Sequence, residues 1–304
     1  MAKFEVNILG CGSAKPTLRH VPSCTVLNIR DSLYMIDCGE GTQIQMQYAQ
    51  LKFQRLNNIF LTHLHGDHVL GLPGLLSTLS LQGKEGYITV YTFANGIEWL
   101  KSQVEFFGGD LSYELRFVEV NPFKPQPVYE DKHMRVRTLP LAHRVPCVGY
   151  IFEEKPNPRH IDKAMCDYHG VPVCMMQHLQ AGEDFVKPDG TVIPNEMLTK
   201  PPSPSFSYAH IGDTAYKPSL AESIGPVDLL YHETTYTKEL GAEAKKRGHS
   251  TAEQAALMAR ACGAKRLLTG HYSSRYKDDN LFLDEASAIF PNTILGQEKL
   301  RIEL

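Results

Sequence analysis

The stretch Thr62-His63-Leu64-His65-Gly66-Asp67-His68 places three histidines and one aspartate within six positions. Imidazole nitrogens and carboxylate oxygens are common ligands of zinc and related divalent metal ions. In a chain with 13 histidines, chance would produce this His-x-His-x-Asp-His pattern in very roughly one protein in a thousand, so a merely structural role for these side chains is the weaker interpretation. The motif therefore predicts a metal site.

The residues around the motif suggest how its side chains are aimed. The apolar run at residues 59–61 is typical of a buried strand. In extended backbone alternate side chains share a face, so His63 and His65 can point at one ion. Asp67 and His68 lie where a helical segment at residues 69–72 starts, and this change of direction can aim them at a neighbouring position. One motif can thus hold halves of two sites.

Three later segments repeat the order of apolar strand, small residue and then histidine or aspartate. Residues 139–142 lead to His143, residues 206–212 to Asp213 and residues 267–270 to His271. Open α/β sheets bind their ligands beyond the ends of strands. A single histidine after a strand is more often structural, but the joint pattern favours three further ligands that converge on the first motif.

Other segments predict the framework of an α/β fold. Residues 4–9 alternate as a half-buried strand, and further strands are expected at residues 24–29, 33–36 and 227–231. Ile44, Tyr48 and Leu51 recur at helical spacing and predict a face that packs on the core. His249 precedes a helix whose start fits two overlapping capping boxes, Ser250 with Glu253 and Thr251 with Gln254. A phosphate could lie at this helix start.

The segment at residues 153–205 differs from the rest of the chain. It has eight prolines and little periodicity, and Lys187-Pro188-Asp189-Gly190 predicts a turn. So long a connection inside a compact unit is usually functional or mobile. We expect an inserted arm on a single domain of residues 1–304. The arm has five basic against eight acidic residues, so it is not an obvious RNA clamp.

Composition sets broad limits. A net charge of −3 and a pI of about 6.5 give no overall electrostatic attraction to nucleic acid or an anionic membrane, although a local basic groove is compatible with them. The seven cysteines form no Cys-x-x-Cys pair, and their odd number in a chain without a recognisable signal peptide predicts reduced thiols and a cytoplasmic location. No apolar run reaches the ~18 residues of a membrane span.

The chain resembles the metallo-β-lactamase superfamily through residues 62–68 with His143, Asp213 and His271. It resembles the ribonuclease Z branch through more specific marks: Gly12-Ser13-Ala14 with Pro16-Thr17, residues 37–43, Gly212-Asp213-Thr214, His232-Glu233-Thr234-Thr235, His249-Ser250-Thr251 and residues 271–276. The resemblance covers essentially the whole chain. It implies a four-layer αβ/βα sandwich, a homodimer, two zinc ions per chain and removal of the 3′ trailer from precursor tRNA.

The resemblance also implies roles for individual residues. One zinc ion would be held by His63, His65 and His143, the other by Asp67, His68 and His271, with Asp213 bridging them. Such a pair of ions activates water for attack on phosphorus. Hydrolysis would leave a 3′-hydroxyl on the tRNA and a 5′-phosphate on the trailer. The catalytic residues would be Asp67, His249 and Glu233. His249 would be the proton donor, and Glu233 would be the carboxylate that orients His249 or a zinc ligand. His210 or Asp37 could fill that supporting role instead of Glu233. Ser273, Ser274 and Arg275 are suited to a phosphate oxygen.

Two departures from the branch pattern keep an alternative open. The arm keeps Gly170-Val171-Pro172 but is less basic than in many members, and the early loop reads Arg19-His20 where Arg-Asn is common. A phosphodiesterase or esterase of the same fold, acting on small molecules, is therefore the alternative. A metal-free binding module is disfavoured because all seven ligand positions carry residues that can bind a metal. A di-iron relative is also disfavoured, because such proteins usually carry a carboxylate at the position of His65.

Overall fold

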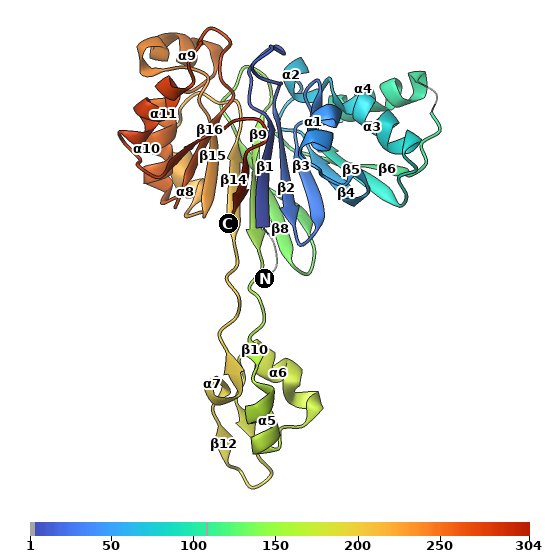
Figure 1. The fold of residues 1–304 in the computed structure, drawn as a ribbon, viewed down its shortest axis with the longest axis vertical. Helices are drawn as coiled ribbons and strands as arrows, with labels where there is room; N and C mark the ends of the chain where they lie inside the picture. Colours follow the sequence, from blue (N-terminus) through green and yellow to red (C-terminus); the bar gives the residue numbers. More distant parts are fainter. Residues whose placement is uncertain (1–3, 108) are drawn as a thin grey trace. The chain divides into compact units, whose positions relative to one another are not determined.

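The computed structural model describes residues 4–107 and 109–304 and contains two large sheets (Figure 1). The first has the order β18-β1-β2-β3-β4-β5-β6. Its antiparallel part joins β18, β1, β2 and β3, and its parallel part runs from β3 to β6. The strands are β1 (Phe4–Gly10), β2 (Cys24–Ile29), β3 (Ser32–Ile36), β4 (Leu56–Phe60), β5 (Tyr87–Thr92), β6 (Glu114–Glu119) and β18 (Arg301–Glu303).

The second sheet has the order β17-β16-β15-β14-β9-β8-β7. The strands from β14 to β17 are parallel, so their carboxyl ends meet at one edge. The strands are β7 (Pro127–Glu130), β8 (Met134–Pro140), β9 (Val148–Glu154), β14 (Ser207–Ile211), β15 (Leu229–Glu233), β16 (Leu267–Gly270) and β17 (Thr293–Leu295).

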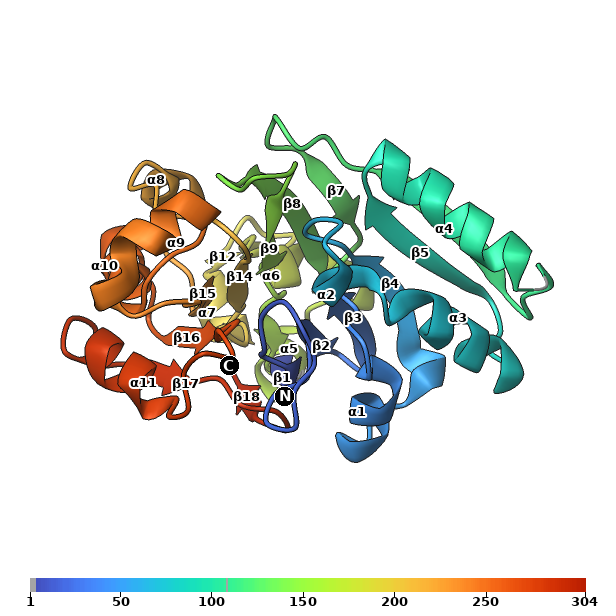
Figure 2. The ribbon, with the colours of Figure 1, turned by 90° about the horizontal axis from the view of Figure 1, so that it is seen from above.

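Helices cover the outer face of each sheet (Figures 1 and 2). The first sheet carries α1 (Thr42–Tyr48), α3 (Leu72–Leu81) and α4 (Ala94–Phe106), and the second carries α8 (Leu220–Ile224), α10 (Ala252–Cys262) and α11 (Asn280–Ser287). The short helices α2 (Gly66–Val69) and α9 (Gly241–Arg247) lie in connections beyond strand ends. The result is the predicted αβ/βα sandwich, and the strands expected at residues 24–29, 33–36 and 227–231 are present as β2, β3 and β15.

Aromatic rings fill the space between the two sheets. Phe60 on β4 stacks on Tyr91 at 4.2 Å between ring centroids and meets Tyr150 and Phe152 of β9 edge-on at 5.2 and 5.3 Å. The hydroxyl of Tyr150 donates to the carbonyl oxygen of Leu61 at 2.8 Å. This contact ties the second sheet to the backbone directly before the histidine motif, so packing of the core fixes where the motif begins.

Two local predictions were wrong. The strand at residues 4–9 is fully buried and not half-buried, because β1 is covered on both faces and Asn7 bonds to Glu5 and to the Val26 carbonyl. Ile44 and Tyr48 do not face the core and are 53% and 63% exposed. Helix α1 buries Thr42 and Met46 instead, since it is only seven residues long and packs through a different face.

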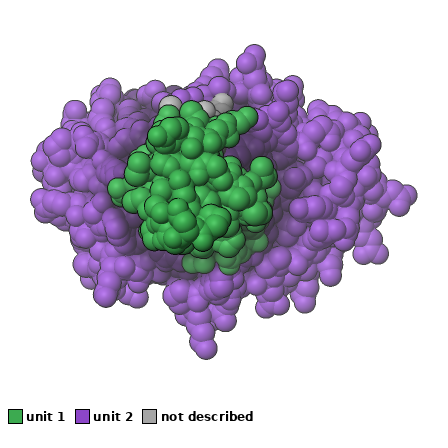
Figure 3. All heavy atoms as spheres, turned by 90° about the horizontal axis from the view of Figure 1, so that it is seen from below, with its two compact units in different colours: residues 1, 130–135, 153–205 green, residues 2–129, 136–152, 206–304 purple. Residues whose placement is uncertain are grey.

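Residues 153–205, together with 130–135, form a compact unit separate from the rest of the described chain (Figure 3). Its small core contains Cys166, Val171, Leu179, Phe185, Ile193 and Leu198. The turn predicted at residues 187–190 joins β11 and β12, where Lys187 N–H donates to the Thr191 carbonyl at 2.9 Å. The elements are β10 (His160–Ile161), α5 (Lys163–His169), α6 (Met176–Ala181), β11 (Phe185–Val186), β12 (Val192–Ile193), α7 (Asn195–Leu198) and β13 (Thr199–Lys200).

Among the described residues no helix combines the length and apolar character needed to cross a membrane. The seven cysteines are free thiols; six are buried and Cys174 is exposed.

Candidate metal centre and active site

The site lies where several strands of both sheets end. β4 ends at Phe60 and is followed by the loop that carries His63 and His65, while Asp67 and His68 belong to the single turn of α2. His143, Asp213 and His271 follow β8, β14 and β16. The sandwich therefore brings together residues that are more than 200 positions apart in sequence.

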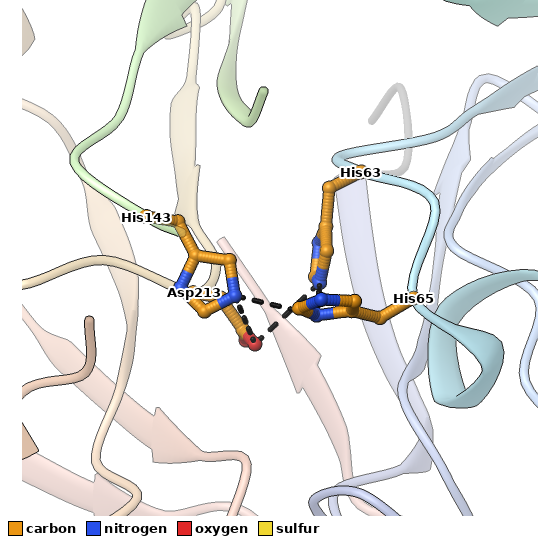
Figure 4. Close-up of side chains that lie close together, drawn as sticks. All are labelled: His63, His65, His143 and Asp213. Atoms are coloured by element: carbon orange, nitrogen blue, oxygen red, sulfur yellow. Dashed lines mark hydrogen bonds and ion pairs between the residues drawn. The ribbon is translucent and has the colours of Figure 1, made fainter. Parts of the chain in front are cut away.

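The first cluster contains His63, His65, His143 and Asp213, whose ligand atoms all lie within 4.8 Å of one another (Figure 4). Nε2 of His63 is 2.9 Å from Nδ1 of His65, which is 3.3 Å from Nε2 of His143. Oδ2 of Asp213 lies 3.6 Å from Nε2 of His63 and 3.7 Å from Nε2 of His143. Three imidazoles and one carboxylate oxygen thus face a single point.

The second cluster contains Asp67, His68 and His271. Nε2 of His271 lies 3.4 Å from Oδ2 of Asp67 and 3.3 Å from Nε2 of His68. The other oxygen of Asp213, Oδ1, is 3.2 Å from Nε2 of His271 and 3.6 Å from Nε2 of His68. One carboxylate therefore presents one oxygen to each cluster, which is the geometry a bridging ligand needs.

A metal ion would satisfy atoms that the protein leaves without partners. Asp213 is 2% exposed, and its Oδ1 has no hydrogen-bond partner in the described part of the chain. A buried carboxylate oxygen without a partner is costly. The imidazole nitrogens of His63 and His65 lie only 2.9 Å apart, a distance at which they can share a cation. The donor set of nitrogen and carboxylate oxygen atoms fits a divalent metal of the zinc type.

Hydrogen bonds orient most of these ligands from behind, as is usual around metals. Nδ1–H of His68 donates to Oδ2 of Asp37 at 2.7 Å, and Nδ1–H of His143 donates to the Gly248 carbonyl at 2.7 Å. Thr62 Oγ1 donates to Asp37 at 2.8 Å and accepts from Nδ1–H of His63 at 3.1 Å. These bonds leave Nε2 of each of the three histidines free to bind metal.

Backbone geometry at the site is strained in places. Asp37 and His271 have φ values of 58° and 62°, a left-handed conformation that costs roughly 1–2 kcal/mol for a residue with a side chain. The tertiary structure holds both in place, and such strain concentrates at functional sites. Gly39 allows the loop after β3 to approach the motif, since a Cβ there would lie 2.5 Å from the Asp67 carbonyl oxygen.

Glu233, at the end of β15, supports two histidines at once. Its Oε1 lies 3.0 Å from Nδ1 of His249, and its Oε2 accepts from the Thr235 hydroxyl at 2.6 Å. Thr235 in turn accepts from Nδ1–H of His271 at 2.9 Å. Burial opposes protonation of His249, but the carboxylates of Glu233 and Asp213 outweigh it and raise the pKa of His249 to about 9. A fully buried carboxylate thus holds a protonated imidazole beside the metal ligands.

The structure separates the supporting roles that the sequence left open. Asp37 pairs with His68 and not with His249. His210 lies in the core, where it bonds to the Tyr208 hydroxyl at 2.9 Å and stacks on Tyr231, and burial lowers its pKa to about 3. Sequence reasoning missed Thr62 and Thr235 as hydrogen-bonding partners of ligands. Thr62 directly precedes His63 and Thr235 lies two positions after Glu233, and this proximity in sequence was the only available signal.

Of the three residues suggested for phosphate binding, Ser273 is tied to Thr235 by a backbone hydrogen bond of 3.3 Å, and the Thr235 hydroxyl lies 3.3 Å from Nδ1 of His249. Arg275 is exposed, donates through Nε to Ser273 Oγ at 3.3 Å and places its guanidinium 5.0 Å from the ring centroid of Tyr236. Ser274 lines a surface hollow of about 330 Å³ that also contains Arg19 and Lys277. This side of the centre therefore carries exposed cations.

Comparison with known proteins places this site in a family. A protein named ribonuclease Z from Parabacteroides distasonis is 48% identical over 304 residues and covers 100% of both chains, and one from Bacteroides fragilis (strain YCH46) is 47% identical with the same coverage. The chain belongs to the ribonuclease Z family. Membership confirms the predicted branch of the metallo-β-lactamase superfamily and the predictions of a hydrolase, a nuclease and metal dependence.

Family models and solved structures agree with the fold of a ribonuclease Z. A model described as anti-Pycsar protein Apyc1 matches residues 4–155, and one described as a beta-lactamase superfamily domain matches residues 198–272. The short form of human tRNase Z superposes with a TM-score of 0.70 at 26% identity and 98% coverage of both chains. The metallo-beta-lactamase fold protein YhfI of Bacillus subtilis also has a TM-score of 0.70, with 100% coverage of both chains, and at 16% identity it shows the fold alone.

Proposed function

We propose that this chain removes the 3′ trailer from precursor tRNA by hydrolysis of one phosphodiester bond, leaving a 3′-hydroxyl on the tRNA and a 5′-phosphate on the trailer. The relatives named ribonuclease Z and the likeness to human tRNase Z support this substrate. The position of Asp213 is the observation that supports hydrolysis by a pair of metal ions, because its two oxygens face two separate ligand clusters. Such a paired site suits hydrolysis at phosphorus.

Two zinc ions per chain are the proposed cofactors. His63, His65 and His143 would hold one ion, Asp67, His68 and His271 the other, and Asp213 both. When bound, such a pair lowers the pKa of a water and stabilises charge on the phosphoryl group. The chain's own contribution is to fix the ligands: Asp67 Oδ2, for example, accepts from the Ala14 amide at 2.7 Å.

His249 is the proposed proton donor to the departing 3′-oxygen. Its ring lies 5.1 Å from that of His143 and 5.6 Å from that of His271, beside both clusters. The carboxylate of Glu233 raises the pKa of His249 and so favours the protonated form, which is the form that a general acid needs. Glu233 is a positioning residue, and Ser273, Ser274 and Arg275 would contact the phosphate.

Three further features are proposed with the family assignment. The arm at residues 153–205 would be a substrate-binding exosite, the enzyme would act as a homodimer and its location would be the cytoplasm. The compact core of the arm supports the first of these, because it can present a defined surface to RNA.

One assay tests the proposal. The metal-loaded protein is incubated with a precursor tRNA that carries a 3′ trailer, and the ends of both products are analysed, with His63→Ala as the inactive control. Cleavage at the tRNA 3′ end with a 5′-phosphate on the trailer is expected. Intact precursor after incubation with protein of verified metal content contradicts the proposal.

The second candidate is hydrolysis of small phosphodiesters by the same centre. The charge of −3 on residues 153–205 favours it, since an RNA-binding arm is usually basic. This function predicts turnover of bis(p-nitrophenyl) phosphate without any cleavage of precursor tRNA.

A further inference from the structure

A hollow of about 530 Å³ opens beside His65, on the side of the first ligand cluster. It lies among the loop that follows β4, the first turn of α4, the end of β6 and the loop between β8 and β9. Its volume lies within the range of small-molecule sites. Because His65 forms part of its wall, whatever fills the hollow touches the substrate region.

The lining indicates the chemical class of the occupant. Leu64, Phe93, Val120 and Pro146 form apolar walls. Asn95 and Glu119 supply the polar atoms, and no hydrogen bond or ion pair engages their side chains within the described residues. No lysine or arginine lines the hollow in the part of the chain that the structure describes, so a phosphate would meet only the negative charge of Glu119. A flat group with apolar faces and polar edges, such as a nucleobase, fits these walls.

We propose that this hollow binds the base of the first trailer nucleotide, an inference that rests on the proposed endonuclease function. The leaving group is the 3′-oxygen of the tRNA, and its proton donor is His249. The trailer stays bonded to phosphorus through its 5′-oxygen, which lies to the side of the line that joins the attacking water and the departing 3′-oxygen. Its first nucleotide therefore extends toward a flank of the centre and not toward His249. The hollow is lined by His65, Val145 and Pro146 and not by His249, which matches such a flank.

A second hollow, formed in part by the segment that follows His271, has different chemistry. Lys277 and Arg19 both line this hollow of about 330 Å³, but the guanidinium of Arg19 pairs with Asp279. Lys277 is therefore the exposed cation that suits a backbone phosphate of the tRNA body. The two hollows thus differ in chemistry: one offers a cation for a phosphate, and the other offers apolar walls for a base. Stacking and burial of one base are worth about 1–3 kcal/mol, which corresponds to roughly 5- to 150-fold in kcat/KM.

The test compares three precursor tRNAs: an intact substrate, one with an abasic first trailer nucleotide and one with an abasic last nucleotide of the tRNA body. For the wild-type enzyme, loss of the first trailer base is expected to lower kcat/KM by roughly 10-fold. Ala94→Trp places an indole in the hollow from an exposed position of α4. This variant should cleave the intact precursor about 10-fold more slowly and should no longer distinguish it from the trailer-abasic substrate.

Ser102→Trp is the matched control, because Ser102 is an exposed residue of the same helix outside the hollow. It should behave as the wild type with all three substrates, and metal content should be equal in all three proteins. The proposal would be overturned if loss of the first trailer base lowered kcat/KM equally in the wild type and in Ala94→Trp. It would also be overturned if Ala94→Trp became insensitive to loss of the last tRNA base and not to loss of the first trailer base. Failure of the endonuclease function itself is distinguishable, because the wild type would then cleave no precursor at all.

Discussion

At the scale of single residues, His249 carries the proton-transfer part of the proposal. His249→Ala should lower turnover by roughly 10²–10⁴-fold while zinc content stays at the wild-type value, because a proton donor contributes that much without binding metal. Single-turnover cleavage of precursor tRNA and metal analysis of the same sample make the measurement. Loss of zinc from the variant would show that His249 is a ligand and not a donor.

Glu233→Gln is a matched variant of the same pair. The amide keeps the shape but removes the charge that raises the pKa of His249, so this pKa falls. A donor must be protonated, and activity is therefore lost on the alkaline side as pH rises through its pKa. The alkaline limb of the pH profile of kcat should move to lower pH in the variant. A limb at the same pH as in the wild type would show that Glu233 does not set the pKa of the proton donor.

Asp213→Ala tests the bridging carboxylate. Because its two oxygens face separate clusters, both ions should be lost. Metal analysis after dialysis gives the result directly. Asp228→Ala is the control, since that carboxylate pairs with Ser207 and Lys265 outside the centre. Retention of two ions per chain in Asp213→Ala would contradict the assignment.

His20 predicts a pH dependence of stability. Hydrogen bonds to Asp279 and Glu298, at 3.0 and 3.2 Å, raise its pKa to about 9. A pKa above the unfolded value of about 6.5 means that the stabilisation is complete below about pH 6.5 and disappears as pH rises through about 9. It amounts to at most roughly 3 kcal/mol.

The free energy of urea unfolding at about pH 6 and about pH 9.5 measures this contribution. The difference between wild type and His20→Asn should be large at the lower pH and small at the higher pH. His178→Asn replaces an exposed histidine of the arm and should show no such trend. If the difference in unfolding free energy between wild type and His20→Asn is the same at both pH values, protonation of His20 does not contribute to stability.

At the scale of elements, the start of α10 positions His249 and Ser250. Thr251 forms the capping box with Gln254, whereas the overlapping box predicted for Ser250 and Glu253 is absent because Ser250 donates to the Thr214 carbonyl instead. Thr251→Ala should cost about 1 kcal/mol of unfolding free energy. Glu253→Ala should cost less than half of that, and equal costs would contradict the observed cap.

The periodicity of apolar residues predicted a helix or strand well where one face of that element packs on the core. It failed where the element is short or is buried on both faces. The strands before the ligands and the cap of α10 follow from local pattern. Helix α1 ends at Tyr48, so of the three apolar residues at helical spacing only Leu51, which lies beyond the helix, packs in the core, whereas Ile44 and Tyr48 are exposed. The full burial of Glu5 and Asn7 in β1 depends on layers formed by distant segments, which no local pattern contains.

At the scale of the whole molecule, the arm can be removed cleanly. Ser205 Oγ donates to the Lys155 carbonyl at 3.1 Å, so the two ends of the segment lie together and a short glycine-serine linker can replace residues 156–204. If the arm is an exosite, kcat/KM for precursor tRNA should fall by roughly tenfold or more, the equivalent of about 1.4 kcal/mol, mainly through KM.

Hydrolysis of bis(p-nitrophenyl) phosphate is the internal control, because that substrate is too small to reach an exosite and its rate should stay near the wild-type value. Unchanged cleavage of precursor tRNA by the armless protein would contradict the exosite proposal.

The sequence by itself determined the metal-dependent chemistry and the residues that converge, because these depend on the types of side chains and on strand-to-ligand spacing. The resemblance of its motifs to a known family predicted the sandwich fold. Only the tertiary structure decided which oxygen of Asp213 faces which cluster, that Glu233 serves both His249 and His271, and that Asp37 serves His68. The physical reason is that hydrogen-bond partners are fixed by the meeting of two sheets, and distances between strand ends are absent from a linear pattern.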